Sequence, residues 1–448
     1  MLHPKLGILA LSVGLLLSAA RAEAQQTAPD SFPLSLREAL NLGLEQNPDV
    51  LIAGYTRSAA GAGVWDAYGN FLPRVSLSGQ VQRVDQGTFV LFGREFESPR
   101  SYNTGYSWDL THSLLDSGRD LFRLRNAQAG VDQAIAGYDM QTLTTATEIE
   151  GQYLEARRRQ ALVERGDVEV ERRTRQLELA QGRYDVGAVT KSDVLLAEVE
   201  LNRAKLAVLQ GNQQLEEARL GLRRLLGGAL PQGPFELTTP FQVFQPAYDV
   251  EDLVARSLQD HPALRESRAQ QEADAAQLWI ARSSYLPSLQ LQYSIQRTAA
   301  DTFAFAWSDF AEQSYLLLGL NWQVFSGFER HNQTSQANAA LQSARAEEVE
   351  RALQIEEDVR AAHSALLTAY ESHVVARQSV ELAAEDLRLA EARYRTGTGS
   401  LVDLVDARTR SAQADVDLIT ATYDFYLALV RLELATGLNL LPDEVDNP

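Results

Sequence analysis

The sequence predicts a mainly α-helical fold with a transmembrane β part, built from one unit that occurs twice. Three observations lead to this prediction. Short motifs recur in the same order about 210 residues apart. Each half contains two segments in which polar and apolar residues alternate, and each half contains a long stretch without proline. We therefore expect a pair of strands joined to a long helical hairpin in each half of the 448-residue chain.

Residues 1–24 have the three parts of a secretory signal peptide. Lys5 precedes an apolar run at 6–17, and small residues dominate 18–24. An anchoring membrane helix is the alternative, but this run is too short to cross about 30 Å of hydrocarbon. We expect cleavage after Ala24 and export of the remaining chain.

Composition excludes several kinds of function. The net charge is −19, which disfavours a nucleic-acid partner. There is no cysteine, so disulfides, thiolate metal ligands and cysteine nucleophiles are excluded. After the signal, no stretch approaches 18 consecutive apolar residues. Any part of the exported chain that spans a membrane must therefore do so as strands.

The two halves share their motifs. Trp65 and the FLP sequence at 71–73 return as Trp279 and YLP at 285–287, and RYDVG at 183–187 returns as RYRTG at 393–397. We place a first repeat at 25–240 and a second at 241–448. Each repeat should open with an amphipathic helix, at 34–47 and 248–261. A second helix should then start at Pro48 and at Pro262, with Asn47 as a cap, and should end before Pro73 or Pro287.

Strands follow these helices, at about 73–84 and 103–114 in the first repeat and about 287–297 and 314–324 in the second. Alternation alone fits an ordinary half-buried sheet as well as a membrane barrel. Strand length, export and aromatic residues at the strand edges favour the barrel. Four strands cannot close a barrel, and open edges are not tolerated in lipid, so several chains must contribute, for example three with twelve strands.

Helical hairpins are expected at about 116–227 and 326–437. Their first arms lack proline over roughly 68 residues, which reach about 100 Å as a helix. The return arms carry apolar or small residues in steps of three and four, starting at Val194 and Leu404. Such a 3.5-residue period predicts a left-handed coiled-coil seam.

Between the arms of the second hairpin, Gly397 and Gly399 are followed by Asp403 and Asp406. An i, i+3 carboxylate pair is commonly no more than a solvated helix face. The glycines do not form a phosphate loop, because the lysine and the preceding strand are missing. The six histidines are scattered, so we expect no metal site, no cofactor and no enzyme activity.

The duplicated FLP and YLP entries and the paired tip motifs resemble the TolC-like outer-membrane efflux proteins, also called outer-membrane factors, over residues 34–440. The resemblance implies a homotrimer with a 12-stranded barrel in the outer membrane and a helical tunnel in the periplasm. It implies a channel that serves as the exit duct of a tripartite efflux pump or a type I secretion system. The implied partners are a periplasmic adaptor, or membrane fusion protein, and an inner-membrane transporter.

By position, the resemblance also implies a gate at the hairpin tips. It implies a hydrogen-bonded latch, aspartate rings that narrow the mouth, and glycines that contact the adaptor. Gly399 stands where the latch of known members has an arginine, and Arg393 or Arg395 would have to replace it. The implied latch residues are Ser192, Asp193 and Tyr394, the ring residues are Asp403 and Asp406, and the adaptor contacts are Gly187 and Gly397.

A second class of protein remains open at this point. A periplasmic coiled-coil adaptor or scaffold without a membrane barrel would also be rich in helical hairpins. The duplicated strand pairs with aromatic edges favour the channel over the scaffold.

Overall fold

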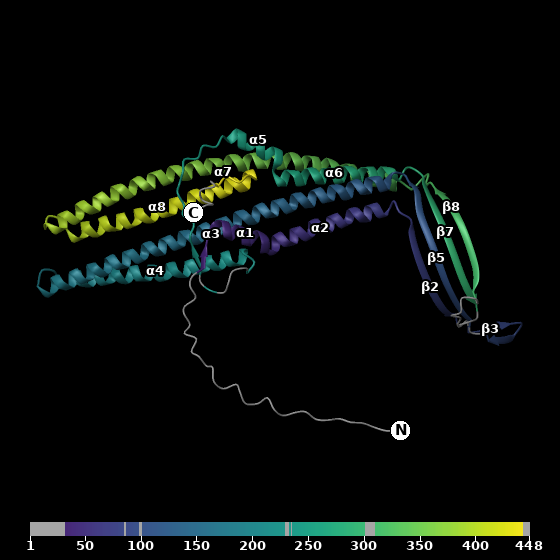
Figure 1. The fold of residues 1–448 in the computed structure, drawn as a ribbon, viewed down its shortest axis with the longest axis horizontal. Helices are drawn as coiled ribbons and strands as arrows, with labels where there is room; N and C mark the ends of the chain where they lie inside the picture. Colours follow the sequence, from purple (N-terminus) through teal and green to yellow (C-terminus); the bar gives the residue numbers. More distant parts are fainter. Residues whose placement is uncertain are drawn as a thin grey trace, which may run out of the picture.

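The structure, a computed structural model, describes residues 32–84, 87–97, 101–228, 233, 235–300 and 310–441. The expected signal peptide at 1–24 lies outside the described residues. The molecule is elongated, with strands at one end, two helical hairpin tips at the other, and shorter elements near the middle (Figure 1). In the described part, no helix is both long and apolar enough to cross a membrane.

The first half contains a short strand, two helices that precede the sheet strands, a small hairpin, and the first long hairpin. The elements are β1 (Phe32–Leu34), α1 (Leu36–Gln46), α2 (Pro48–Gly69), β2 (Arg74–Val84), β3 (Thr88–Leu91), β4 (Arg94–Glu97), β5 (Ser101–Asp116), α3 (Arg119–Asp185) and α4 (Lys191–Leu225).

The second half repeats this order without the small hairpin among the described residues. Its elements are β6 (Phe235–Leu237), α5 (Val250–Asp260), α6 (Pro262–Ser283), β7 (Ser288–Ala300), β8 (Ala311–Asn321), α7 (Glu329–Arg395) and α8 (Leu401–Thr436). Pro48 and Pro262 each occupy the start of a helix, as the sequence predicted. The first arms α3 and α7 each have 67 residues, so both span about 100 Å.

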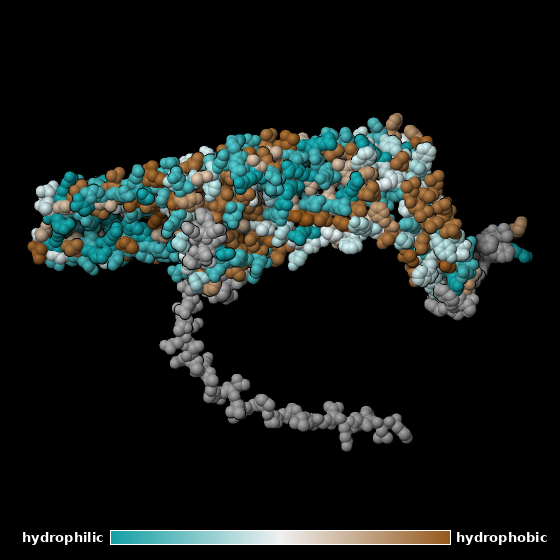
Figure 2. Space-filling model, turned by 45° about the horizontal axis from the view of Figure 1, so that its top comes forward, coloured by the Kyte–Doolittle hydropathy of each residue, from teal (hydrophilic) through white to brown (hydrophobic). Residues whose placement is uncertain are grey.

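The four long strands form one antiparallel sheet in the order β2-β5-β7-β8. The register brings apolar residues of neighbouring strands to the same face, because Leu77 pairs with Trp108 and Trp108 pairs with Ile295. On the opposite face Ser294 Oγ donates to Asp109 Oδ1 over 2.7 Å. Hydrophobic side chains gather over the strands, whereas hydrophilic ones cover much of the helices (Figure 2). The sheet thus has one apolar face open to its surroundings.

The last strand lies about three residues earlier than the sequence pattern indicated. We expected it at about 314–324, but β8 spans Ala311–Asn321. Its final pair is Asn321 with Ser288, which follows Pro287. Because proline has no N–H to donate, the ladder stops there. Trp322 therefore leaves the strand, and its Nε1 donates to the Tyr285 carbonyl over 3.2 Å.

The long helices pack in a continuous layer. Helix α3 contacts α2 and α4 as well as α6 and α8, and α6 and α8 also contact α7. The positions predicted for the seam of α4, from Val194 to Leu225, are all buried or half-buried. This burial confirms the coiled-coil period, because the same face of the helix meets its neighbour along the whole length. The outer positions of the layer are taken by α2 with α4 on one side and by α7 on the other.

Two hydrophobic cores surround the middle of the molecule. One joins β1, α1 and β6 to α3 and α4, and in it the buried Tyr153 hydroxyl donates to the Leu34 carbonyl over 2.8 Å. The other joins α5, the 241–250 segment and the chain after α8 to α7 and α8. Burial raises the pKa of Tyr426 in this second core to about 12. At these cores the return helices meet shorter helices end to end: α4 meets α2, and α8 meets α6.

Asn47 connects α4 to α2. Its Oδ1 accepts the N–H of Asp49 over 2.8 Å, which caps the start of α2, and its Nδ2 donates to the Leu225 carbonyl over 2.9 Å at the end of α4. The backbone after α4 and the backbone at the end of α1 approach closely here, since a Cβ on Gly227 would lie 2.3 Å from the Gln46 carbonyl oxygen. One amide side chain therefore makes hydrogen bonds to a free carbonyl at the end of α4 and to a free N–H at the start of α2.

His261 does the same between α8 and α6. Its Nδ1 accepts the Ala263 N–H over 3.2 Å, and its Nε2 lies 3.3 Å from the Leu434 carbonyl. A neutral ring with its proton on Nε2 satisfies both contacts. Burial lowers the pKa of His261, because the charged ring would lose water.

We predict that this junction makes stability depend on pH. Because the pKa of His261 is lower in the folded protein, the junction contributes fully above the unfolded value of about 6.5, and its contribution is lost as pH falls through the folded value. Thermal unfolding at about pH 8 and about pH 5 should show a lower melting temperature in acid. His261→Asn, which copies Asn47, should have a smaller difference between the two. An equal pH dependence in this variant would contradict the assignment.

Candidate functional site at the hairpin tips

The two hairpin tips are built in the same way. In the first, α3 ends at Asp185, Gly187 has a φ of +74°, and Thr190 caps α4. In the second, α7 ends at Arg395, Gly397 has a φ of +79°, and Ser400 caps α8. Nothing lies within 4 Å of a Cβ built on either glycine. Glycine is thus needed for the left-handed backbone, and both tips leave open space around it.

The first aspartate of each return helix belongs to a capping box. Asp193 Oδ2 accepts the Thr190 N–H over 2.8 Å and the Thr190 hydroxyl over 2.9 Å. In the second tip, Asp403 Oδ2 accepts the Ser400 N–H over 3.2 Å, and Ser400 Oγ accepts the Asp403 N–H over 3.1 Å. Hydrogen bonding of the Asp403 carboxylate with the Ser400 side chain, and next with the Ser400 backbone N–H, lowers the pKa of Asp403 and stabilises its charged form.

Asp403 and Asp406 are both exposed, and the buried side chains of Leu404 and Ala407 lie beside them on the helix. The two carboxylates therefore share the solvent side of α8, as their spacing predicted. Asp403 is held by its capping box, whereas Asp406 lies near Arg410. The hydrogen bond with Asp386 raises the pKa of Arg410, and the charge of Asp406 adds to this. Among the described residues, no group of three histidines, aspartates or glutamates could hold a metal ion.

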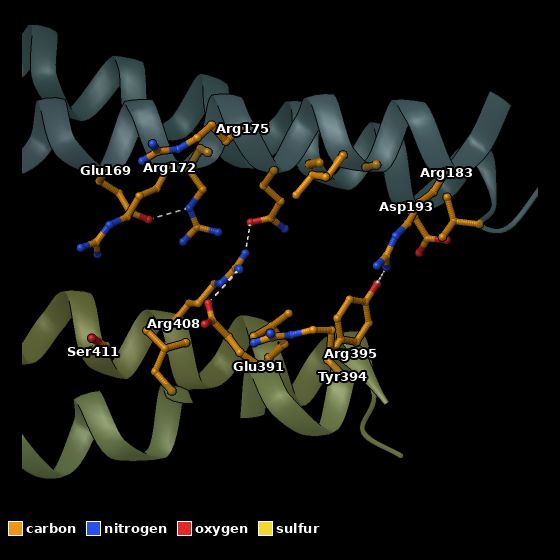
Figure 3. A pocket seen from close by; sticks show the side chains of 18 of the residues that line it. Glu169, Arg172, Arg175, Arg183, Asp193, Glu391, Tyr394, Arg395, Arg408 and Ser411 are labelled. Carbon is orange, nitrogen blue, oxygen red and sulfur yellow. Dashed lines mark hydrogen bonds and ion pairs between the residues drawn. The ribbon is translucent and has the colours of Figure 1, made fainter. Parts of the chain in front are cut away.

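The tips are joined by Arg183 and Tyr394, which come from the two matching RYxxG motifs. Arg183 Nη1 donates to the Tyr394 hydroxyl over 3.4 Å, and its Cζ lies 5.6 Å from the centre of the ring. Figure 3 shows the two side chains pointing toward each other across a cleft, with Asp193 next to Arg183. We expected Ser192 and Asp193 to meet Tyr394. In the structure Tyr394 contacts Arg183, which was not among the residues expected for the latch.

The neighbours of Gly399 favour glycine at the position where known members of the family have an arginine. A Cβ on Gly399 would lie 3.0 Å from the Arg393 Cβ and 3.3 Å from the Arg393 carbonyl carbon. The Gly399 N–H also donates to the Arg393 carbonyl over 3.1 Å. A side chain at this position would require Arg393 to shift by a few tenths of an ångström. The cation near Tyr394 therefore comes from the other hairpin, and the repeated RY pair was the signal that could have identified it.

Further contacts between the hairpins lie behind the tips. Arg165 Nη2 of α3 pairs with Asp415 Oδ2 of α8 over 2.6 Å, and Arg158 Nη1 pairs with Asp424 Oδ1 over 3.3 Å. Nearer the tips, Arg408 donates to Gln176. Between the two hairpins lies a cleft of about 870 Å³, and Arg183, Tyr394 and Arg408 are among its lining residues. Polar contacts thus join the hairpins across an open cleft.

Comparison with known proteins identifies the family. A sequence profile described as "Outer membrane efflux protein" matches residues 39–228 and 253–438. The chain is similar to Protein CyaE of Bordetella pertussis, with 30% identity over 388 residues that cover 84% of this chain and 78% of that protein. It is also similar to Outer membrane protein TolC of Vibrio cholerae, with 25% identity over 426 residues, 90% of each chain.

Solved structures show the same fold. The Campylobacter jejuni CmeC outer membrane channel superposes with a TM-score of 0.76 at 16% identity, over 99% of this chain and 96% of that one. The Neisseria gonorrhoeae MtrE outer membrane channel superposes with a TM-score of 0.73 at 20% identity, over 90% of this chain and 88% of that one. The chain therefore belongs to the outer membrane efflux protein family and is a protein of the outer membrane.

Proposed function

We propose that three copies of this chain form a channel through the outer membrane. The observation that carries the proposal is the four-stranded sheet, which has one apolar face and two outer strands, β2 and β8, that each have one strand neighbour among the described residues. Lipid does not tolerate unpaired strand edges, so β8 of one copy would pair with β2 of the next. Three copies give twelve strands, and the helices of each copy would continue the wall into the periplasm.

Exposed apolar side chains on the outer helices support the same assembly. Helix α4 exposes Leu206 and Leu209, and α7 exposes Val349, Leu353 and Leu382. These helices hold the outer positions of the layer, so each would meet the other in a neighbouring copy. Apolar side chains covered in this way would be removed from water, which favours association.

The protein in this proposal is an exit duct for a tripartite efflux pump or a type I secretion system. A periplasmic adaptor would contact the tips at Gly187 and Gly397, where the space around the backbone is open. An inner-membrane transporter would supply the energy. Each copy would consist of a first repeat at 25–240 and a second at 241–448, and the two tips would lie at the periplasmic mouth.

Membrane fractionation and planar-bilayer recording test this function. We expect heat-modifiable trimers in the outer-membrane fraction, and channels of uniform conductance from the purified trimer. The competing function is a periplasmic adaptor or scaffold without a barrel. A monomer that stays in the soluble periplasmic fraction and forms no channels would favour that competitor and contradict the channel.

The gate of the proposed channel would include the tip contacts and rings of Asp403 and Asp406. Six carboxylates at a narrow mouth would attract cations. We expect Asp406→Asn to weaken block by Mg²⁺ roughly tenfold or more, because it removes charge without breaking a helix cap. Asp403→Asn should weaken block and also weaken the capping box at the start of α8, because Asp403 is its N3 residue.

Bilayer recordings with Mg²⁺ on the tip side measure both variants. Asp417→Asn is the matched control, since Asp417 is exposed on the same helix farther from the tip. Block of the Asp417→Asn channel by Mg²⁺ should equal that of the unchanged protein. Equal block in all three variants would show that these carboxylates do not line the mouth.

A further inference from the structure

The loop between β8 and α7 exposes three large apolar side chains. Val324, Phe325 and Phe328 are 74%, 75% and 76% exposed. The rings of Phe325 and Phe328 meet edge to face with centroids 6.2 Å apart, so they form one apolar projection. We call residues 324–328 the aromatic loop. Exposure of this kind at one short loop marks an interaction surface.

Phe328 has a backbone conformation that disfavours phenylalanine. It caps α7 with a φ of +70°. The matching residue before α3 in the first repeat is Gly118, with a φ of +77°. Glycine adopts this left-handed region without strain, whereas a phenylalanine there is strained. The Phe328 side chain is largely exposed, so packing against the rest of the chain does not explain why a phenylalanine occupies this strained backbone position.

Arg330 holds the aromatic loop in this shape. Its Nη2 donates to the Val324 carbonyl over 2.8 Å, its Nε to Ser326 Oγ over 3.1 Å, and its Nη1 to the Ser284 carbonyl over 3.3 Å. Its Cζ also lies 4.9 Å from the centre of the Tyr285 ring. A single guanidinium thus ties the loop to the end of α6. The apolar side chains are presented by a prearranged backbone.

The position of the loop identifies what it would meet. It directly follows β8, whose exposed leucines Leu318 and Leu320 belong to the apolar face of the sheet. It directly precedes α7, whose first turn carries Glu329 and Arg330. The aromatic loop therefore lies where the apolar sheet gives way to the charged helices, which is the level of a membrane interface.

We propose that the aromatic loop inserts into the interfacial layer of the phospholipid leaflet on the helix side of the membrane. This inference rests on the proposed membrane sheet and names an additional contact outside the strands. Phe325 and Phe328 would enter the boundary between head groups and acyl chains, as apolar side chains of interfacial segments do. Because Gly118 takes the place of Phe328 in the first repeat, each chain would supply one such anchor.

The absence of cysteine allows a direct test on the full-length protein. Phe328→Cys gives a single site for an environment-sensitive NBD fluorophore, and Ser343→Cys on the exposed side of α7 gives a matched control. Both labelled proteins are reconstituted in phosphatidylethanolamine and phosphatidylglycerol vesicles, with or without a lipid that carries a doxyl quencher near its head group. We expect blue-shifted emission at position 328 that the doxyl lipid quenches at least about twofold, and neither effect at position 343.

Arg330→Gln, combined with Phe328→Cys, tests the positioning role. Loss of the guanidinium should reduce the quenching at position 328 while trimers and conductance persist. Emission at position 328 that is unquenched by doxyl lipid would overturn the inference, whether water or a second copy surrounds the loop. Conductance of the same vesicles separates the two proposals. Conducting trimers without quenching contradict the anchor alone, whereas vesicles without trimers or conductance contradict the channel.

Discussion

Replacing Phe425 with alanine is expected to lower the free energy of unfolding by about 3–5 kcal/mol, the range for truncating a buried phenylalanine. Phe425 lies on α8 and is 0% exposed. Its ring centre is 5.3 Å from that of Phe244, 5.3 Å from that of Tyr426 and 6.3 Å from that of Tyr370. The side chain therefore joins α8, α7 and the 241–250 segment, and its loss leaves a cavity among all three.

Circular dichroism during heating measures this effect in detergent at a fixed protein concentration, since assembly contributes to apparent stability. Arg203→Ala is the control. The Arg203 side chain is 74% exposed, and its ion pair with Glu200 lies on one helix surface, so it should contribute no more than about 1 kcal/mol. If both variants melted at the same temperature, burial of Phe425 would not contribute the expected stability.

Arg183→Ala is expected to raise the open probability of the proposed channel. The residue links the two tips through one hydrogen bond and the face of the Tyr394 ring. At an exposed site such a contact is worth about 0.5–1 kcal/mol. If the three copies of a trimer open together, the free energies lost with the three contacts add. The equilibrium between closed and open channel then shifts about tenfold to 100-fold toward the open state.

Single-channel recording provides the measurement. Tyr394→Phe keeps the ring and removes the hydroxyl, so its effect should be smaller than that of Arg183→Ala. Together with the unchanged protein and the double variant, the two single variants complete a double-mutant cycle. Arg175→Ala is the matched control, because the ion pair of Arg175 is with Glu171 of the same helix. Unchanged gating in Arg183→Ala, or an equal change in Arg175→Ala, would rule out the proposed link.

The contacts behind the tips set how far such an opening can extend. Arg165 with Asp415 and Arg158 with Asp424 join α3 to α8 nearer the middle of the molecule. Breaking the link between Arg183 and Tyr394 leaves these pairs in place. The tips can therefore separate first, while the cores around Tyr153 and Phe425 keep the two halves together.

Local sequence patterns predicted most of the elements. The alternation at 75–82 lies within β2, the prolines at 48 and 262 begin helices, and the seam that starts at Val194 is buried or half-buried along α4. Each of these signals depends on neighbours a few residues apart, whose periodicity decides which face is buried. The membership in an outer-membrane family, inferred from the paired motifs, is confirmed by the family match.

The sequence alone thus determined the duplication, the order of strands and helices, and the glycines that turn the chain at both tips. Only the tertiary structure decided which side chains meet across the halves. Arg183 contacts Tyr394, His261 joins α8 to α6, and β8 stops at Asn321. These outcomes depend on how far one helix or strand is shifted along another that is distant in sequence. Periodicity specifies the buried face of an element, but that axial shift is set by packing of the assembled chain.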